Sequence, residues 1–103
     1  MEHVSDGFMT FMREGGKVSQ AFMEMVTQTA EASAMDRKTD ELAYIAVLAA
    51  VRMSGGMAFH VKSAKKLGAT RDEIKSAVLV GLPAVGLQVL ESLSAALDSY
   101  DEE

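Results

Sequence analysis

The stretch that decides the fold is residues 36–67, which read DRKTDELAYIAVLAAVRMSGGMAFHVKSAKKL. It begins with Asp36, a residue type that caps helix N-termini, and continues with apolar residues at helical spacing. Ser54, Gly55 and Gly56 break the pattern, and a second helical pattern then runs to Gly68. We therefore predict a central hairpin of two helices, over residues 37–53 and 57–67.

The flanking segments also have a helical period. We predict a helix over about 6–14 and a second over about 19–34, and the second has a predicted buried face made of Phe22, Met25, Val26 and Thr29. Thr70 and Glu73 have the spacing of a capping box, which predicts a helix start between them. Pro83 lacks an amide proton, so it either kinks that helix or opens the last one. The expected fold is all-α, with about six helices in a single domain over 1–103.

Composition and charge narrow the class of protein. The chain has 103 residues, of which 49% are hydrophobic and 24% charged, as in a globular protein. A net charge of −5 argues against nucleic-acid binding, which needs a basic surface. The absence of cysteine excludes disulfides, thiolate metal sites and thiol catalysis. Apolar runs fall short of the roughly 20 residues that span a membrane, and no secretory signal is visible, so we expect a cytoplasmic protein.

Abundant Ala, Met and Leu suggest that copies of the chain bury apolar surface against one another, so we expect a homo-oligomer.

His60 stands out because it shares a helix face with Met57 and Leu67, which predicts that it points inward. One interpretation is a core histidine satisfied by a carbonyl or carboxylate, and the other is a catalytic or ligand-binding group. A single histidine without cysteine is a poor metal site, so we expect no metal ion and no cofactor.

Three stretches within residues 36–86 resemble the carboxymuconolactone decarboxylase-like family, which includes the alkyl hydroperoxide reductase D (AhpD) type. They are DRKTDELAYIAVLAA, HVKSAKKLGAT and RDEIKSAVLVGLPAV. The first matches the family's Asp-x-Lys/Arg-Thr-x-Glu-Leu helix start, the second its histidine-bearing helix closed by Gly-Ala-Thr, and the third its Glu-Ile helix. The resemblance implies an AhpD-like helical fold that assembles as dimers, trimers or hexamers.

The resemblance also implies roles for individual residues. In the redox-active branch, two cysteines stand seven and four positions before the histidine, where this chain has Met53 and Gly56. Glu41 and His60 match the acid–base partners of that branch. Because a thioether and a glycine supply no thiolate, we expect no disulfide or peroxidase-supporting activity. The cysteine-less decarboxylase branch carries charged residues before the histidine, and here Arg52 is the nearest cation.

Straight helix geometry does not by itself predict a contact between Glu41 and His60. In a straight antiparallel hairpin the two residues would lie more than about 10 Å apart along the axis, at 1.5 Å per residue. A contact within one chain would need a steep helix crossing, and otherwise the pair would meet across a subunit interface or not at all. Glu41 also has a purely structural interpretation, because an acid near a helix N-terminus favours the helix dipole.

A small-ligand pocket is the remaining expectation. Gly55 and Gly56 either only permit the tight turn or also leave a hollow beside His60. That hollow would be lined by apolar residues, namely Met53, Met57, Tyr44 and Phe59. Two hypotheses of function follow. In the first, the chain is a non-thiol enzyme that uses His60 and Glu41 for acid–base chemistry on a small carbonyl or lactone-like molecule. In the second, it is a catalytically degenerate oligomeric binding or scaffold protein.

Overall fold

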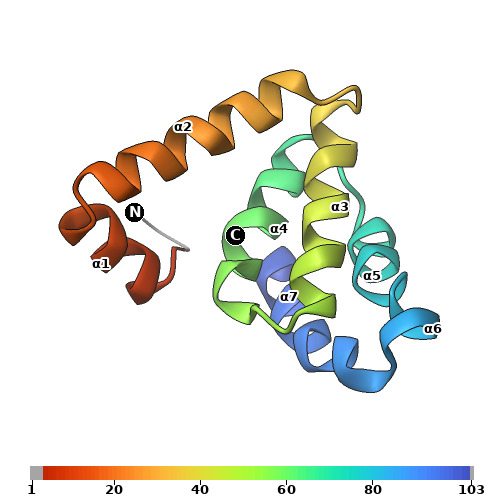
Figure 1. Cartoon of the computed structure of the whole chain (residues 1–103). Coiled ribbons are helices and arrows are strands. Elements are labelled where there is room, and N and C mark those ends of the chain that lie inside the picture. The colour runs from red at the N-terminus through yellow and green to blue at the C-terminus, as the bar shows by residue number, and fades with distance from the viewer. Residues whose placement is uncertain (1–3, 103) are drawn as a thin grey trace.

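The structure is a computed structural model that describes residues 4–102, so the predicted domain over 1–103 reaches beyond the described residues at both ends. Helices follow one another along these residues, with no strand among them (Figure 1). They are α1 (Asp6–Glu14), α2 (Lys17–Ala32), α3 (Arg37–Ala50), the 3-10 helix η1 (Ser54–Gly56), α4 (Met57–Lys66), α5 (Arg71–Leu79), the single-turn α6 (Leu82–Val85), the 3-10 helix η2 (Leu87–Ser92) and α7 (Leu93–Asp101). The all-α prediction is confirmed.

The central hairpin of α3 and α4 packs with α5 and α7 around one apolar core. The largest of its fully buried side chains include Ile45, Met57, Ile74, Val61 and Val78. Removing each such side chain from water stabilises the fold by about 1.5–3 kcal/mol. The apolar spacing of residues 36–67 therefore does form the hairpin that it predicts, because the core needs one continuous face from each helix.

Local sequence signals fix where these helices begin. The Asp36 carboxylate accepts a hydrogen bond from the Thr39 amide at 2.8 Å, at the start of α3. At the start of α5, the Thr70 hydroxyl accepts from the Glu73 amide at 3.0 Å, and the Glu73 carboxylate accepts from the Thr70 amide at 2.9 Å. The capping box is confirmed. Pro83 lies in the first turn of α6 and so begins a new helix, but this is not the last helix as predicted, because η2 and α7 follow it.

Helix α3 ends at Ala50, three residues before the predicted end of the first hairpin helix. Arg52 has a φ of 59°, a left-handed conformation that stops a helix and that only glycine adopts freely. The amide of Met53 then donates back to the Leu48 carbonyl at 2.9 Å, so the chain reverses at once. Residues 51–53 are therefore connection rather than helix, and all three are exposed.

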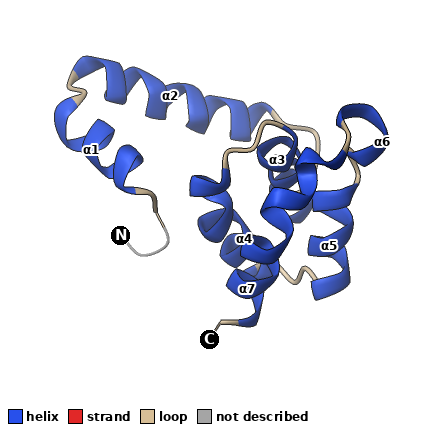
Figure 2. Ribbon diagram, turned by 90° about the horizontal axis from the view of Figure 1, so that it is seen from below, coloured by secondary structure: helices blue, strands red, loops and turns tan. Residues whose placement is uncertain are grey.

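Helices α1 and α2 form an arm that stands off from the bundle, as both Figure 1 and Figure 2 show. The arm is held together by three aromatic rings, Phe8, Phe11 and Phe22, with centroids 5.7–6.5 Å apart. The buried face predicted for the second helix is wrong, because Met25, Val26 and Thr29 are exposed. Among the 16 residues of α2, only Ser19 is buried. A helical stripe of apolar residues predicts a contact surface but not which part of the chain covers it.

The C-terminal end of the chain is tied to α4. The ammonium of Lys65 donates to the Tyr100 carbonyl at 2.6 Å, and that of Lys62 donates to the Glu102 carbonyl at 3.2 Å. The Tyr100 hydroxyl donates to the Ala69 carbonyl at 2.8 Å. Cations are favoured near the carbonyls at the C-terminus of a helix, and here the lysines of α4 lie beside the C-terminal carbonyls of α7. These contacts hold the end of α7 against α4.

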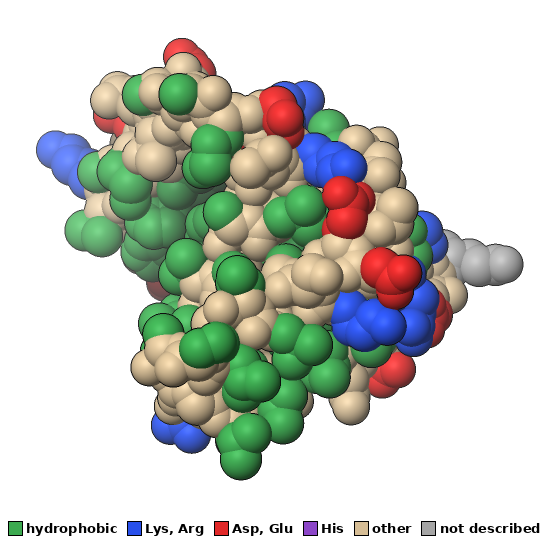
Figure 3. Space-filling view, turned by 90° about the vertical axis from the view of Figure 1, so that its right-hand side faces the viewer, with side chains coloured by type: hydrophobic (Ala, Val, Ile, Leu, Met, Phe, Trp, Pro, Cys, Tyr) green, Lys and Arg blue, Asp and Glu red, His purple; other side chains and the backbone are tan. Residues whose placement is uncertain are grey.

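Hydrophobic side chains also reach the surface in number. On the face drawn in Figure 3 they gather mostly on one side, and most Lys, Arg, Asp and Glu side chains lie on the other. Between residues 4 and 102, no helix has both the length and the apolar character that crossing a membrane requires.

Candidate functional site

The structure brings Glu41 of α3 and His60 of α4 together within one chain. The Glu41 Oε2 atom lies 2.8 Å from the His60 Nδ1 atom. Both side chains are largely buried, with 22% of Glu41 and 21% of His60 exposed. This contact corrects the straight-hairpin geometry, which placed the two residues more than 10 Å apart, and it needs no subunit interface.

The connection between α3 and α4 explains why Glu41 and His60 lie so close together. Because α3 ends early and the chain reverses at Met53, α4 begins alongside α3 rather than beyond its end. A Cβ added at Gly56 would lie 3.5 Å from the Leu48 side chain, which shows that the two positions are level. His60 stands four residues after Gly56, about 6 Å along α4, and so reaches the level of Tyr44 and the Glu41 side chain.

Two aromatic side chains hold the imidazole from different sides. The Tyr44 ring stacks on it, with centroids 4.1 Å apart and planes inclined by 26°. The Phe59 ring meets it edge-on, with centroids 5.2 Å apart and planes inclined by 78°. Offset stacking and edge-to-face contacts are the favoured arrangements of aromatic rings. The plane of the His60 ring is therefore fixed by packing as well as by the hydrogen bond to Glu41.

The remaining predicted pocket residues divide into three cases. Gly56 borders the site, since a Cβ there would lie 3.9 Å from the Cδ2 atom of His60. Met57 is fully buried in the core. Its side chain follows the core face of α4 with Val61 and Ala64. Met53 lies in the connection and is 62% exposed.

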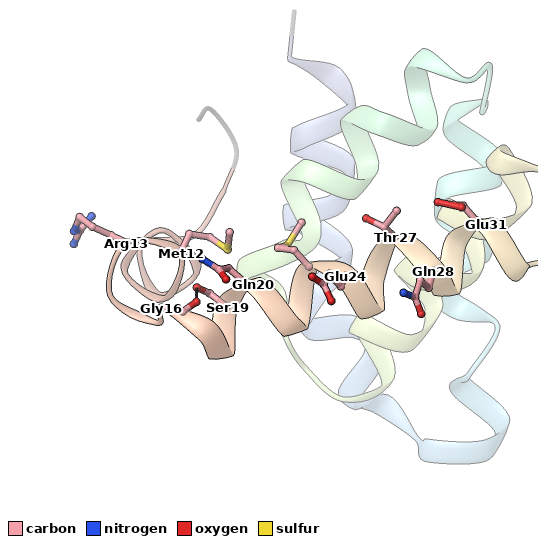
Figure 4. A pocket seen from close by; sticks show the side chains of 10 residues that line it. Met12, Arg13, Gly16, Ser19, Gln20, Glu24, Thr27, Gln28 and Glu31 are labelled. Atoms are coloured by element: carbon pink, nitrogen blue, oxygen red, sulfur yellow. Dashed lines mark hydrogen bonds between the residues drawn. The ribbon is translucent and has the colours of Figure 1, made fainter.

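Two shallow hollows lie along α2. The larger, of about 910 Å³, runs between α1 and the outer side of α2, and polar side chains make up most of its lining (Figure 4). The smaller, of about 380 Å³, lies on α2 alone. Neither is lined by Glu41 or His60. Within one chain, the Glu41–His60 pair therefore lies at a partly covered surface rather than inside either hollow.

Two cations close to the site in sequence, Lys38 and Arg52, are paired with acids elsewhere. The Lys38 ammonium lies 3.0 Å from the Glu73 carboxylate, and a hydrogen bond from the Thr70 backbone together with this lysine lowers the pKa of Glu73. Arg52 lies 3.5 Å from the Glu91 carboxylate. Among residues 4–102, no group of three or more His, Asp or Glu side chains is arranged to hold a metal ion.

The geometry specifies which nitrogen of His60 is available for chemistry. A carboxylate only accepts hydrogen bonds, so in this contact the Nδ1 atom carries the hydrogen and donates it to Glu41. The Nε2 atom of the neutral ring is then the one with a free lone pair. A carboxylate on Nδ1 also stabilises the imidazolium that forms when Nε2 takes up a proton. The arrangement is that of a general base oriented by an acid.

The chain is an all-α bundle built around a central helical hairpin, and the comparisons with known proteins agree with this fold. The sequence profile of the carboxymuconolactone decarboxylase family matches residues 16–99. The chain belongs to the carboxymuconolactone decarboxylase family.

One solved structure is similar over nearly the whole chain. It is the apo crystal structure of a carboxymuconolactone decarboxylase family protein from Legionella pneumophila. The two share 25% sequence identity with a TM-score of 0.78, and the match covers 92% of this chain and 85% of that one. No curated protein matches the chain by sequence. The match includes the arm as well as the bundle, because 92% coverage cannot be reached without part of α1 and α2.

Proposed function

We propose that this chain is a non-thiol enzyme that uses His60 and Glu41 for acid–base chemistry on a small carbonyl or lactone-like molecule. The observation that carries the proposal is the 2.8 Å contact between the Glu41 carboxylate and the His60 Nδ1 atom. In the proposed mechanism, Nε2 of His60 removes a proton, either from the carbon next to a carbonyl or from a water that attacks a lactone. Glu41 stabilises the imidazolium until the proton is returned to the product.

The redox chemistry of the AhpD-type branch is outside this proposal. That chemistry needs a pair of thiols, and the sequence contains no cysteine. Gly56 supports this distinction, because the position faces His60 with room for a Cβ but carries no sulfur. A substrate carboxylate is also a poor fit, since Arg52, the nearest cation before His60 in the sequence, is paired with Glu91. We therefore propose substrates whose reacting end is uncharged.

The test is a panel of small lactones and ketones, assayed for hydrolysis and for exchange of the proton next to the carbonyl with deuterium. General acid–base catalysis contributes about 10²–10⁴-fold to rate. Replacing the base with His60→Gln should remove that factor, and Glu41→Gln should remove a smaller part of it. Thr10→Ala, an exposed change on α1, is the matched control and should leave the rate unchanged. Equal rates for the wild type and His60→Gln on every active substrate would contradict the proposal.

A second candidate function is a catalytically degenerate oligomeric binding or scaffold protein. It is favoured by one observation, that neither of the two hollows along α2 includes the Glu41–His60 pair. In this alternative the pair only stabilises the packing of α3 on α4. His60→Ala would then lower the melting temperature sharply while no ligand affinity changes.

The assembly and location of the chain complete the proposal. We propose that it works as a single domain in a homo-oligomer, because large hydrophobic side chains are exposed on both the arm and α3. We also propose a cytoplasmic location, which fractionation of cells expressing a tagged chain would test.

A further inference from the structure

Two apolar surfaces of this chain are left without a cover, and each has a defined geometry. The first, called the arm stripe, consists of Val18, Met25 and Val26 on α2, which are 67%, 51% and 38% exposed. Their i, i+7, i+8 spacing places them on one side of the helix. An α-helix of 16 residues with one buried residue gains little stability within its own chain beyond the contact of Phe22 with α1.

The second surface, called the site face, surrounds the Glu41–His60 pair. It consists of Tyr44 and Val47 of α3 and of Val51, the residue directly after that helix, which have the spacing i, i+3 and i+7, together with Phe59 of α4. All four are more than 40% exposed. Two of them, Tyr44 and Phe59, are the rings in contact with the imidazole. Anything that covers the site face therefore also covers the candidate site.

The surface area of the chain indicates how much is left to bury. A compact monomer of 11.0 kDa exposes about 5,600 Å². This chain exposes 6772 Å². The excess of roughly 1,100 Å² exceeds the 800 Å² or so that each partner buries in an interface of standard size. The uncovered area is thus sufficient for one stable contact between copies.

We infer that the arm stripe of a second copy of this chain packs on the site face and closes the Glu41–His60 site. A two-fold axis makes the contact reciprocal, so each copy covers the site of the other and both surfaces are used twice. The second copy supplies the apolar wall that the site lacks within one chain. This inference rests on the proposed function in one respect, that proton transfer at His60 benefits from exclusion of bulk water.

The N-terminal end of the arm also contacts the turn that precedes α4. A Cβ added at Gly55, in the turn before α4, would lie 3.3 Å from the Cβ of Ser5, and Ser5 caps the N-terminus of α1. The start of the arm therefore rests against the turn that leads to His60. Docking of the arm on a second copy and the position of that turn are coupled by this contact.

The first test measures molar mass by sedimentation equilibrium at micromolar concentrations. The wild type should have at least twice the chain mass of 11.0 kDa. The double substitution Val18→Glu and Met25→Glu places charges on exposed positions, so the fold is retained, and it should weaken association at least 100-fold. The matched control is Gln20→Glu, an exposed position on the opposite, polar side of α2, which should leave the mass unchanged.

The second test locates the contact, and it uses the absence of native cysteine. A tagged Met25→Cys chain is mixed with an untagged Val47→Cys chain and treated with a short bismaleimide. A tagged–untagged heterodimer should form, and the Gln20→Cys chain in place of Met25→Cys should give at least ten times less. A monomeric wild type, or an oligomer without the Met25–Val47 cross-link, would overturn the inference. Because neither test measures turnover, a failure of the proposed catalysis would leave their outcome unaffected.

Discussion

Replacing Glu41 should change which nitrogen of His60 carries the hydrogen, and this can be measured without knowing the substrate. In the wild type, the Glu41 carboxylate accepts from Nδ1 at 2.8 Å, which favours the tautomer with a free Nε2. Glu41→Met keeps a side chain of similar length but removes the acceptor. Glu41→Gln is the matched control, because its amide oxygen can still accept from Nδ1.

The structure sets the size of the effect. A hydrogen bond to a charged group contributes about 1.5–3 kcal/mol to stability. About a fifth of each side chain is exposed, so water replaces part of the lost bond, and we expect about 1–2 kcal/mol for Glu41→Met. That energy corresponds to a change of about 5- to 30-fold in the ratio of the two tautomers. It also lowers the melting temperature, by roughly 4–8 °C for each kcal/mol in a domain of this size.

The assay is a pair of measurements on the same samples. Nitrogen-15 NMR of the imidazole reports the tautomer above the pH at which the ring is protonated, and thermal unfolding followed by circular dichroism reports stability. Glu41→Met should lose the tautomer preference and some stability, whereas Glu41→Gln should keep most of the preference. If the tautomer ratio is the same in the wild type and Glu41→Met, Glu41 does not orient His60, and the general-base assignment of Nε2 loses its support.

Three further predictions address other parts of the chain. Gly56→Cys places a thiol in contact with His60, so it should be alkylated several-fold faster than the same cysteine in a His60→Ala background. Ser92→Ala should leave stability unchanged or raise it by about 1 kcal/mol in urea unfolding, because this buried hydroxyl has no hydrogen-bond partner among residues 4–102. Hydrogen bonding to Arg71 lowers the pKa of Asp101 below its usual 3.8, so the pair stabilises the fold above that pH and less as pH falls through it. The difference in melting temperature between the wild type and Asp101→Asn should therefore be present at pH 7 and vanish in strong acid, and a difference that persists there would contradict this origin.

Several features of the fold could be predicted from the sequence because they depend only on residues that are close together in the chain. Asp36 and the Thr70–Glu73 capping box each form hydrogen bonds within four residues, so no knowledge of the rest of the fold is needed to predict them. Pro83 lacks an amide proton, so it is tolerated in the first turn of a helix, and it lies in the first turn of α6. The apolar period of residues 36–67 predicted the hairpin, because two helices with one apolar face each have few ways to bury both. The family resemblance added Glu41 and His60 as a pair.

What only the tertiary structure decided depends on contacts between distant residues. The reversal at Arg52 and Met53 slides α4 back along α3, and this shift, invisible in a helical period, turns an expected separation of more than 10 Å into a hydrogen bond. In this arrangement Met57 is buried in the core, whereas Met53 is exposed in the connection. On α2, the apolar stripe is real, but no other part of the same chain covers it. A sequence records which side chains avoid water, whereas the surface that covers them is set by how the whole chain, or a second copy of it, is arranged in space.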